Sequence, residues 1–232
     1  MKKVKLFCIP HAGGSATTYL KWKKYLHHSI DLVPLELSGR GNRMGSSFYE
    51  TIDEAVDDLY HRVRDEINDY RYAFYGHSMG SIITYELTHK LIELNCKRPN
   101  HIFFSGREAP QINKGKRIHL SPETEFREEI LKIGGTPRDI FEHDELRRIY
   151  LPVLRADFKI HENYVYVPKN QIFDFDITVL CGKNDQELTP DDLAGWRSHT
   201  RANCAICMID GGHMFIVENV ETVTGMINSV LA

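Results

Sequence analysis

Hydrophobic and polar positions follow two different periods along the chain. Short runs rich in β-branched and aromatic residues, which are typical of buried strands, occupy 4–9, 31–37, 72–75, 100–106, 176–182 and 204–209. Between several of these runs, hydrophobic residues recur every three or four positions, which predicts helices. The alternation of strands and helices predicts an α/β fold with a mostly parallel sheet and helices on both faces.

The clearest helix is predicted from Ile52 to Ile67. Its hydrophobic residues fall on one face, and Thr51 with Glu54 has the spacing of a capping box. Further helices are predicted after the strand at 72–75, from Pro190 to about His199, and at the end of the chain as far as Leu231. Each follows a predicted strand, as a parallel sheet requires.

The alternation breaks between about residues 107 and 170. Ser121-Pro122 and Thr136-Pro137 predict two helix starts, and Gly134-Gly135 predicts a stop between them. Pro152 predicts an interruption of the hydrophobic run around it. The segment therefore contains several short helices rather than a continuation of the sheet.

Such an insertion predicts a lid over the carboxyl ends of the strands, where ligands of these folds bind. A second core domain is the alternative, but the segment is short and broken. We expect one α/β domain over residues 1–232, with the lid insertion at about 107–170.

Composition is that of an ordinary globular protein, with 42% hydrophobic residues, 26% charged residues and a formal net charge of −3. This balance argues against nucleic acid as the main ligand, because phosphate binding leaves a basic footprint. No hydrophobic run is long enough to span a bilayer, and the run after the basic amino terminus ends at Pro10 without the length of a signal peptide.

The five cysteines are scattered, which suits reduced thiols in a cytoplasmic protein. Cys204 and Cys207 form a lone CxxC pair inside a predicted strand, and no second pair accompanies them. We interpret them as packed thiols, and we expect neither a metal nor a cofactor.

The candidate chemistry centres on Gly76-His77-Ser78-Met79-Gly80, a GxSxG pattern between a predicted strand and a predicted helix. Glycines on both sides of Ser78 remove Cβ atoms that would collide at a strained strand-to-helix turn. The following helix aims backbone N–H groups at charge that develops nearby. A chance match in a chain of this length has a probability of about 0.1, so the context carries the prediction that Ser78 is a nucleophile.

A glycine-rich loop, His11-Ala12-Gly13-Gly14-Ser15, follows the first strand. It lacks the spacing of a phosphate-binding loop. It can present a backbone N–H to an oxyanion, as HGGG-type loops do, or it can be a simple turn. Both alternatives stay open on the sequence. In the loop after the second strand, Arg40 and Arg43 can bind an anion or cap loops, and we favour a solvated position for both.

A nucleophilic serine needs a base, and His213 is the best placed of the 12 histidines. It follows a strand and two glycines, at the same end of the sheet as Ser78. Asp185, after the preceding strand, is the candidate acid, with Asp210 as a weaker alternative. The order Ser, Asp, His is that of α/β-hydrolases. His77 points away from Ser78, whereas His11 can line the pocket.

Five segments together give a more specific indication. They are Phe7-Cys8-Ile9-Pro10-His11-Ala12-Gly13-Gly14-Ser15-Ala16, Gly76-His77-Ser78-Met79-Gly80, Ser105-Gly106-Arg107-Glu108-Ala109-Pro110, Leu154-Arg155-Ala156-Asp157-Phe158 and Gly211-Gly212-His213-Met214-Phe215. Together they resemble motifs of the type II thioesterases, stand-alone proteins that work beside nonribosomal peptide and polyketide synthetases, and the resemblance covers nearly the whole chain.

The resemblance implies hydrolysis of acyl thioesters on the phosphopantetheine arm of acyl or peptidyl carrier domains, clearing misprimed or stalled groups. It implies Ser78 as nucleophile, His213 as base and Asp185 as acid. The backbone N–H groups of Ala12 and Met79 are the implied oxyanion donors. We also assign His11 and His77 to substrate binding.

Three further expectations accompany this assignment. The partners are carrier domains, with no nucleic acid and no membrane, and the protein is a cytoplasmic monomer. The nearest alternatives are a chain-terminating fatty acyl thioesterase and a small-molecule carboxylesterase. A catalytically silent carrier-binding protein is the alternative from another class.

Overall fold

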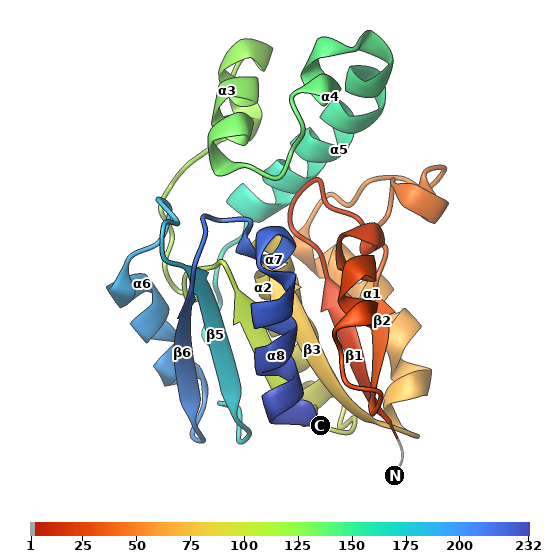
Figure 1. Ribbon diagram of the computed structural model, residues 1–232, viewed down its shortest axis with the longest axis vertical. Helices are drawn as coiled ribbons and strands as arrows, with labels where there is room; N and C mark the ends of the chain where they lie inside the picture. Colours follow the sequence, from red (N-terminus) through yellow and green to blue (C-terminus); the bar gives the residue numbers. More distant parts are fainter. Residues whose placement is uncertain (1–2) are drawn as a thin grey trace.

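The computed structural model describes residues 3–232 and is built around a parallel sheet (Figure 1). Within these residues the sheet has six strands in the order β2-β1-β3-β4-β5-β6, and every neighbouring pair is parallel. This confirms the predicted fold class. The strands are β1 (Val4–Ile9), β2 (Ile30–Pro34), β3 (Arg71–His77), β4 (His101–Ser105), β5 (Ile177–Gly182) and β6 (Cys204–Ile209).

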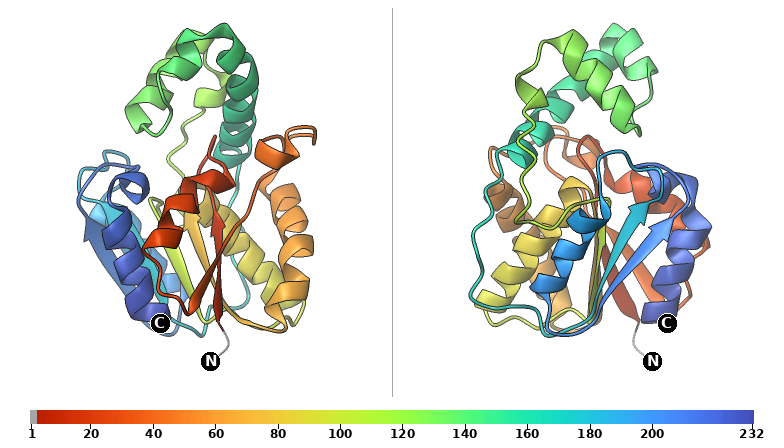
Figure 2. Two further views of the ribbon diagram at one scale, coloured as in Figure 1. Left: turned by 45° about the vertical axis from the view of Figure 1, so that its right-hand side comes forward. Right: turned by 90° about the vertical axis from the view of Figure 1, so that its left-hand side faces the viewer.

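Helices cover both faces of the sheet (Figure 2). On one face lie α1 (Ile52–Ile67), α2 (Met79–Glu93), α6 (Pro190–Ala194) and the 3-10 turn η4 (Gly195–His199). On the other lie the 3-10 segment η1 (Ala16–Lys24), α7 (Phe215–Glu218) and α8 (Val220–Leu231). Each face has its own buried hydrophobic cluster, so the sheet is buried on both sides, as the hydrophobic strand sequences require.

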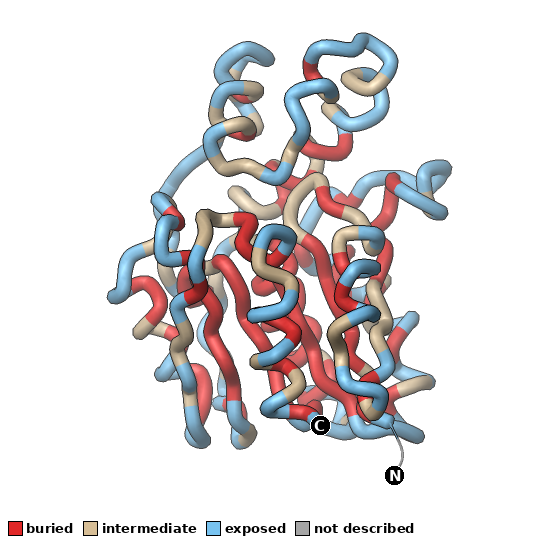
Figure 3. Tube along the Cα trace, in the orientation of Figure 1, coloured by how far each residue is buried: buried red, intermediate tan, exposed pale blue. Residues whose placement is uncertain are grey.

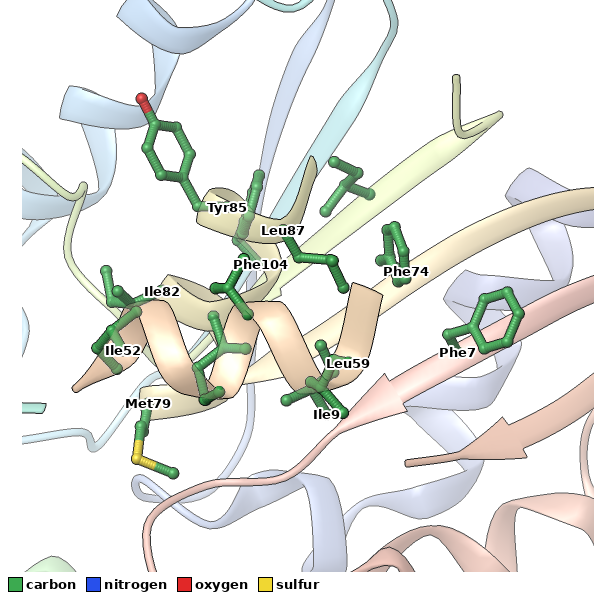
Figure 4. Close-up of a cluster of buried hydrophobic side chains, with 14 of the residues drawn as sticks. Phe7, Ile9, Ile52, Leu59, Phe74, Met79, Ile82, Tyr85, Leu87 and Phe104 are labelled. Carbon is green, nitrogen blue, oxygen red and sulfur yellow. The ribbon is translucent and has the colours of Figure 1, made fainter. Parts of the chain in front are cut away.

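Helix α2 lies at the centre of one of these clusters. Side chains of α1, including Ile52 and Leu59, pack on it from outside, while Phe7 and Phe74 of the sheet lie beneath (Figure 4). Almost every residue of α2 is buried, which explains its hydrophobic sequence on all sides. The catalytic candidate Ser78 therefore precedes one of the most firmly packed helices of the molecule.

The segment between β4 and β5 forms the predicted group of short helices. It contains η3 (Ile118–Leu120), α3 (Glu123–Ile133), α4 (Asp139–Glu142) and α5 (Asp144–Glu162), and it stands above the carboxyl ends of the strands (Figures 1 and 2). A small cluster of its own, around Phe126 and Phe158, holds it together. Its outer faces are largely exposed (Figure 3). That this segment acts as a lid on a single domain stays a prediction.

Pro152 does not interrupt the hydrophobic run, and this prediction was wrong. Helix α5 continues through Pro152 for its full 19 residues. Proline removes the N–H that would bond to the carbonyl of Arg148, but both residues are exposed. Water can therefore bond the freed carbonyl.

Smaller differences concern helix ends. Thr51 accepts the N–H of Glu54 as predicted, but the Glu54 carboxylate accepts the N–H of Glu50, which leaves the capping box half formed. The final helical segment breaks at Asn219 into two helices. Within residues 3–232, no helix is long and apolar enough to cross a membrane.

Candidate active site

Ser78 lies at the turn from β3 into α2, with φ of 54° and ψ of −118°. A positive φ is costly for a residue with a Cβ, and such strain concentrates at functional sites. The turn is held by the N–H of Ser78, which donates to the Ser105 carbonyl at 2.7 Å. The Ser81 hydroxyl donates to the carbonyls of Gly76 and Ser105, which joins the ends of β3 and β4 below the turn.

The two glycines of the GxSxG pattern are required because a Cβ at either position would clash with backbone atoms. A Cβ on Gly76 would lie 2.3 Å from the Gly80 carbonyl oxygen. A Cβ on Gly80 would lie 2.3 Å from the Ile9 carbonyl oxygen, at the end of β1. The turn therefore packs directly against the strand that leads into the His11–Ser15 loop, as only glycine permits.

His213 and Asp185 are joined by a hydrogen bond of 2.8 Å between Nδ1 and Oδ2. They come from loops after β6 and β5, and these loops touch: a Cβ on Gly182 would lie 2.2 Å from the Gly212 carbonyl oxygen. The Asp185 side chain is fully buried, and its Oδ1 accepts the N–H of Glu187 at 3.0 Å. The alternative acid, Asp210, is exposed and pairs with Lys183.

Ser78 and His213 open onto one cavity of about 330 Å³, which Ala12 also lines. The cavity is bounded by the stretch after β4, by α5 and by Tyr164 to Tyr166. Among residues 3–232, no hydrogen bond joins the Ser78 hydroxyl to His213. Catalytic hydrogen bonds are often long in ligand-free enzymes and tighten in the complex, so their shared cavity is the relevant observation.

Of the two predicted oxyanion donors, Ala12 lines this cavity, and Met79 directly follows Ser78. Met79 is the first residue of α2, where a backbone N–H has no intrahelical acceptor. Ala12 lies in a tight turn in which the Gly14 N–H donates to the His11 carbonyl at 2.9 Å. Gly13 has a φ of +75°, which matches the third position of a type II turn.

The two histidines assigned to substrate binding occupy different positions. His11 lines a smaller hollow of about 20 Å³ together with Ser78 and His213. His77 lines neither cavity; it is fully buried and bonds the Ser105 hydroxyl at 2.9 Å. His77 is the last residue of β3, and successive side chains of a strand point to opposite faces, so its side chain points away from that of Ser78. We therefore do not propose that His77 contacts the substrate.

Burial makes several imidazoles near His213 resistant to protonation. Burial, followed by the charges of His213 and Arg40, lowers the pKa of His11 to about 3. Burial is also the main cause that lowers the pKa of His77 and of His161 well below the usual value. Of these four rings, only His213 has a carboxylate partner, so it is the one equipped to carry a proton.

Arg40 is buried, and the interpretation of both arginines as solvated was wrong. Its guanidinium forms a two-pronged ion pair with Asp157 of α5, at 2.5 and 2.6 Å. Arg43 pairs in the same way with Asp58 of α1, at 2.6 and 2.9 Å. Burial works against the charge of Arg40, but Asp157 outweighs it and raises the pKa of Arg40.

Sequence reasoning also missed two polar side chains of the main cavity. Arg107 and His161 both line it and contact each other, and Arg107 pairs with Glu108 at 3.2 Å. Arg107 lies within the motif Ser105–Pro110, and that motif is the sequence signal that could have indicated it. Within residues 3–232, no group of three or more His, Cys, Asp or Glu side chains can hold a metal ion.

The parallel sheet and the strained serine turn at its carboxyl edge define an α/β-hydrolase. A family model described as the thioesterase domain matches residues 4–231, and the chain belongs to the thioesterase family. It is a thioester hydrolase, as predicted.

Relatives and solved structures point to the same type. Gramicidin S biosynthesis protein GrsT of Aneurinibacillus migulanus is 36% identical over 218 residues, covering 94% of this chain and 84% of GrsT. ClbQ from the colibactin NRPS/PKS pathway superposes with a TM-score of 0.94 at 33% identity, covering 99% of this chain and 97% of ClbQ. BorB, a type II thioesterase from the borrelidin biosynthetic cluster, superposes at 0.88 with 30% identity, covering 99% and 93%. The resemblance to type II thioesterases is thereby confirmed.

Proposed function

We propose that this thioesterase removes acyl groups from the phosphopantetheine arms of carrier domains in nonribosomal peptide or polyketide biosynthesis. Support comes from its similarity to the gramicidin S biosynthesis protein GrsT, to ClbQ from the colibactin NRPS/PKS pathway and to BorB, a type II thioesterase from the borrelidin biosynthetic cluster. The carrier domain is the partner in this proposal. The observation that carries the chemistry is the strained Ser78 opening onto the same cavity as the His213–Asp185 pair.

In the first half-reaction, Ser78 Oγ attacks the thioester carbonyl carbon while His213 Nε2 takes the hydroxyl proton. The carbonyl oxygen becomes an oxyanion, which the N–H groups of Ala12 and Met79 stabilise. The carbon–sulfur bond then breaks. His213 returns the proton to the departing pantetheine sulfur, and the acyl group stays on Ser78.

In the second half-reaction, His213 takes a proton from water, and the hydroxide attacks the acyl-serine ester. The ester bond breaks, the proton passes from His213 to Ser78 Oγ, and the free acid leaves. Asp185 holds the Nδ1 proton of His213 in both steps, which keeps Nε2 facing the reaction and stabilises the imidazolium.

Replacement of the nucleophile tests the chemistry directly. Ser78→Ala is expected to lower kcat on acetyl-loaded carrier protein by about 10⁶-fold, because the nucleophile is lost. Its thermal midpoint should match the wild type or exceed it, since alanine adds no atom at the turn. Ser229→Ala, on the exposed side of α8, is the matched control and should keep full turnover. Near-wild-type turnover by Ser78→Ala would contradict the assignment.

Three substrates separate this function from its alternatives. Rates on an acyl carrier protein, on acyl-CoA and on a p-nitrophenyl ester are compared at equal acyl chain length. The proposal expects the carrier thioester to be preferred, whereas a preference for the oxyester would support a carboxylesterase. In a separate series that varies the acyl chain length on a fatty acid carrier, a preference for long chains would support chain termination. Failure of a fluorophosphonate to label Ser78 would support the silent carrier-binding protein.

We also propose that the protein works as a monomer in the cytoplasm, with the segment at about 107–170 as a lid. The five cysteines are free, which suits a reducing compartment. Helices α3 to α5 stand above the carboxyl ends of the strands (Figure 1), and residues of α3 and α5 line the cavity, which supports the lid. Light scattering at increasing protein concentration tests the monomer, and a concentration-dependent rise in mass would overturn it.

A further inference from the structure

A buried ion pair connects α5 to the loop that carries Ala12. The side chains of Arg40 and Asp157 are 6% and 3% exposed, and Nη1 of Arg40 donates to Oδ2 of Asp157 while Nη2 donates to Oδ1. Asp157 Oδ2 also accepts the N–H of Gly13 at 2.7 Å. The same nitrogen of Arg40 that meets Oδ2 donates to the Gly14 carbonyl at 3.0 Å. The pair therefore bonds both an N–H and a carbonyl of one turn.

The bonded N–H belongs to the central peptide of the turn, between Ala12 and Gly13. Type I and type II turns differ by a flip of this peptide, in which ψ of Ala12 and φ of Gly13 each change by about 150–170°, so the flip would change the conformation of Ala12. Fixing the Gly13 N–H fixes the peptide that directly follows the oxyanion donor. The direction of the Ala12 N–H is thereby tied to Asp157.

Helix α5 also presses on the turn through a second residue. Leu154 lies one turn before Asp157, on the same face of α5, and a Cβ on Gly13 would lie 2.3 Å from its Cδ2. The turn is thus held by a hydrogen bond and by direct packing. Both contacts come from the inserted segment rather than from the sheet.

Stability alone does not account for such a pair. Removing two charges from water is expensive, and well-packed hydrophobic replacements of buried ion pairs are often neutral or stabilising. A hydrophobic pair, however, cannot bond the Gly13 N–H or the Gly14 carbonyl. The chemistry that only the ion pair supplies is the orientation of the turn.

We propose that Asp157, held in place by Arg40, is a positioning residue that aims the Ala12 N–H at the oxyanion. This inference rests on the proposed function and deepens it. Helix α5 then belongs to the catalytic machinery, and any opening of the insertion has to occur elsewhere along it. Asp157 touches no reacting atom; it acts through the turn.

The test uses two variants of this pair and one control pair. Asp157→Asn keeps the shape but loses the charge that Arg40 needs. The double variant Arg40→Met with Asp157→Leu removes both charges together, which guards against misfolding caused by one unpaired charge. The control is Arg43→Met with Asp58→Leu, which removes a similar two-pronged pair anchoring the same stretch to α1, away from Gly13.

The expected result is a loss in kcat on acetyl-pantetheine for both Asp157 variants, with KM little changed. Loss of an oxyanion donor costs about 10²–10³-fold in kcat, and a misaimed donor should cost up to that amount. The pH profile should fall in height without moving its midpoint, because His213 and Asp185 are untouched. The control pair should keep the wild-type kcat.

A second measurement separates positioning from general damage. An acyl-pantetheine trifluoromethyl ketone forms an oxyanion on Ser78, whereas the matching thioether does not. The Asp157 variants should lose affinity for the ketone by the same factor as kcat and bind the thioether unchanged. Equal losses for ketone and thioether, or an unchanged kcat, would overturn the proposal. These outcomes leave the proposed function standing, because the Ser78→Ala variant and the comparison of substrates test that function separately.

Discussion

Single residues at the site are placed by close backbone packing. Ser78 keeps an unfavourable φ because α2, β4 and the end of β1 surround the turn on three sides. The pattern of glycines, a serine and the order of Asp185 and His213 was enough to predict these positions. The role of Asp157 was not predictable, because its partner Arg40 lies 117 residues away and no local pattern links them.

A pair of glycine substitutions tests the packing at the turn. Gly76→Ala should lower the free energy of unfolding by about 1–3 kcal/mol, since the new Cβ would meet backbone atoms that cannot move aside. Gly225→Ala is the control: nothing lies within 4 Å of its Cβ, and it is inside α8. It should gain about 0.5–1 kcal/mol. Urea unfolding measures both, and a Gly76→Ala variant as stable as the wild type would refute this packing.

At the scale of elements, the strands and long helices could be predicted from the spacing of their hydrophobic residues. The helices of the inserted segment were harder to predict, because they are stabilised by tertiary contacts that do not show in the spacing of hydrophobic residues. Pro152 stands inside α5, whose other side is fixed by Leu154 and Asp157 against the turn at Gly13. Tertiary contacts of this kind outweigh the local cost of a proline on an exposed face. The same contacts make α5 part of the site rather than a freely moving flap.

At the scale of the whole molecule, buried histidines connect stability to pH. Six of them have lowered pKa values, mainly because of burial: about 3 for His11 and His89, about 4 for His101 and His199, and well below the usual value for His77 and His161. Their unfolded pKa is about 6.5, so between these values the unfolded chain binds more protons than the folded one. Their contribution is complete above about pH 6.5, declines as the pH falls, and is lost once the pH passes each folded pKa, about 4 for His101 and His199 and about 3 for His11 and His89.

The predicted slope can be measured by urea unfolding across this range. Each neutral buried histidine contributes up to about 1.4 kcal/mol per pH unit to the decline in the free energy of unfolding. His89→Leu should flatten the decline, because it removes one titrating group from the core cluster around Phe173. His61→Gln, on the exposed side of α1, should leave the slope as it is. A stability independent of pH between about 6.5 and 4 would contradict the burial of these rings.

The most direct test of the central claim is to trap the acyl group on the protein. The enzyme is mixed with excess acetyl-loaded carrier protein, quenched in acid within the first turnover, and digested for mass spectrometry. The account predicts an added acetyl mass on the peptide that contains Ser78, and none in the Ser78→Ala variant. Release of acetate with the acetyl mass on another residue, or with equal speed in Ser78→Ala, would contradict it.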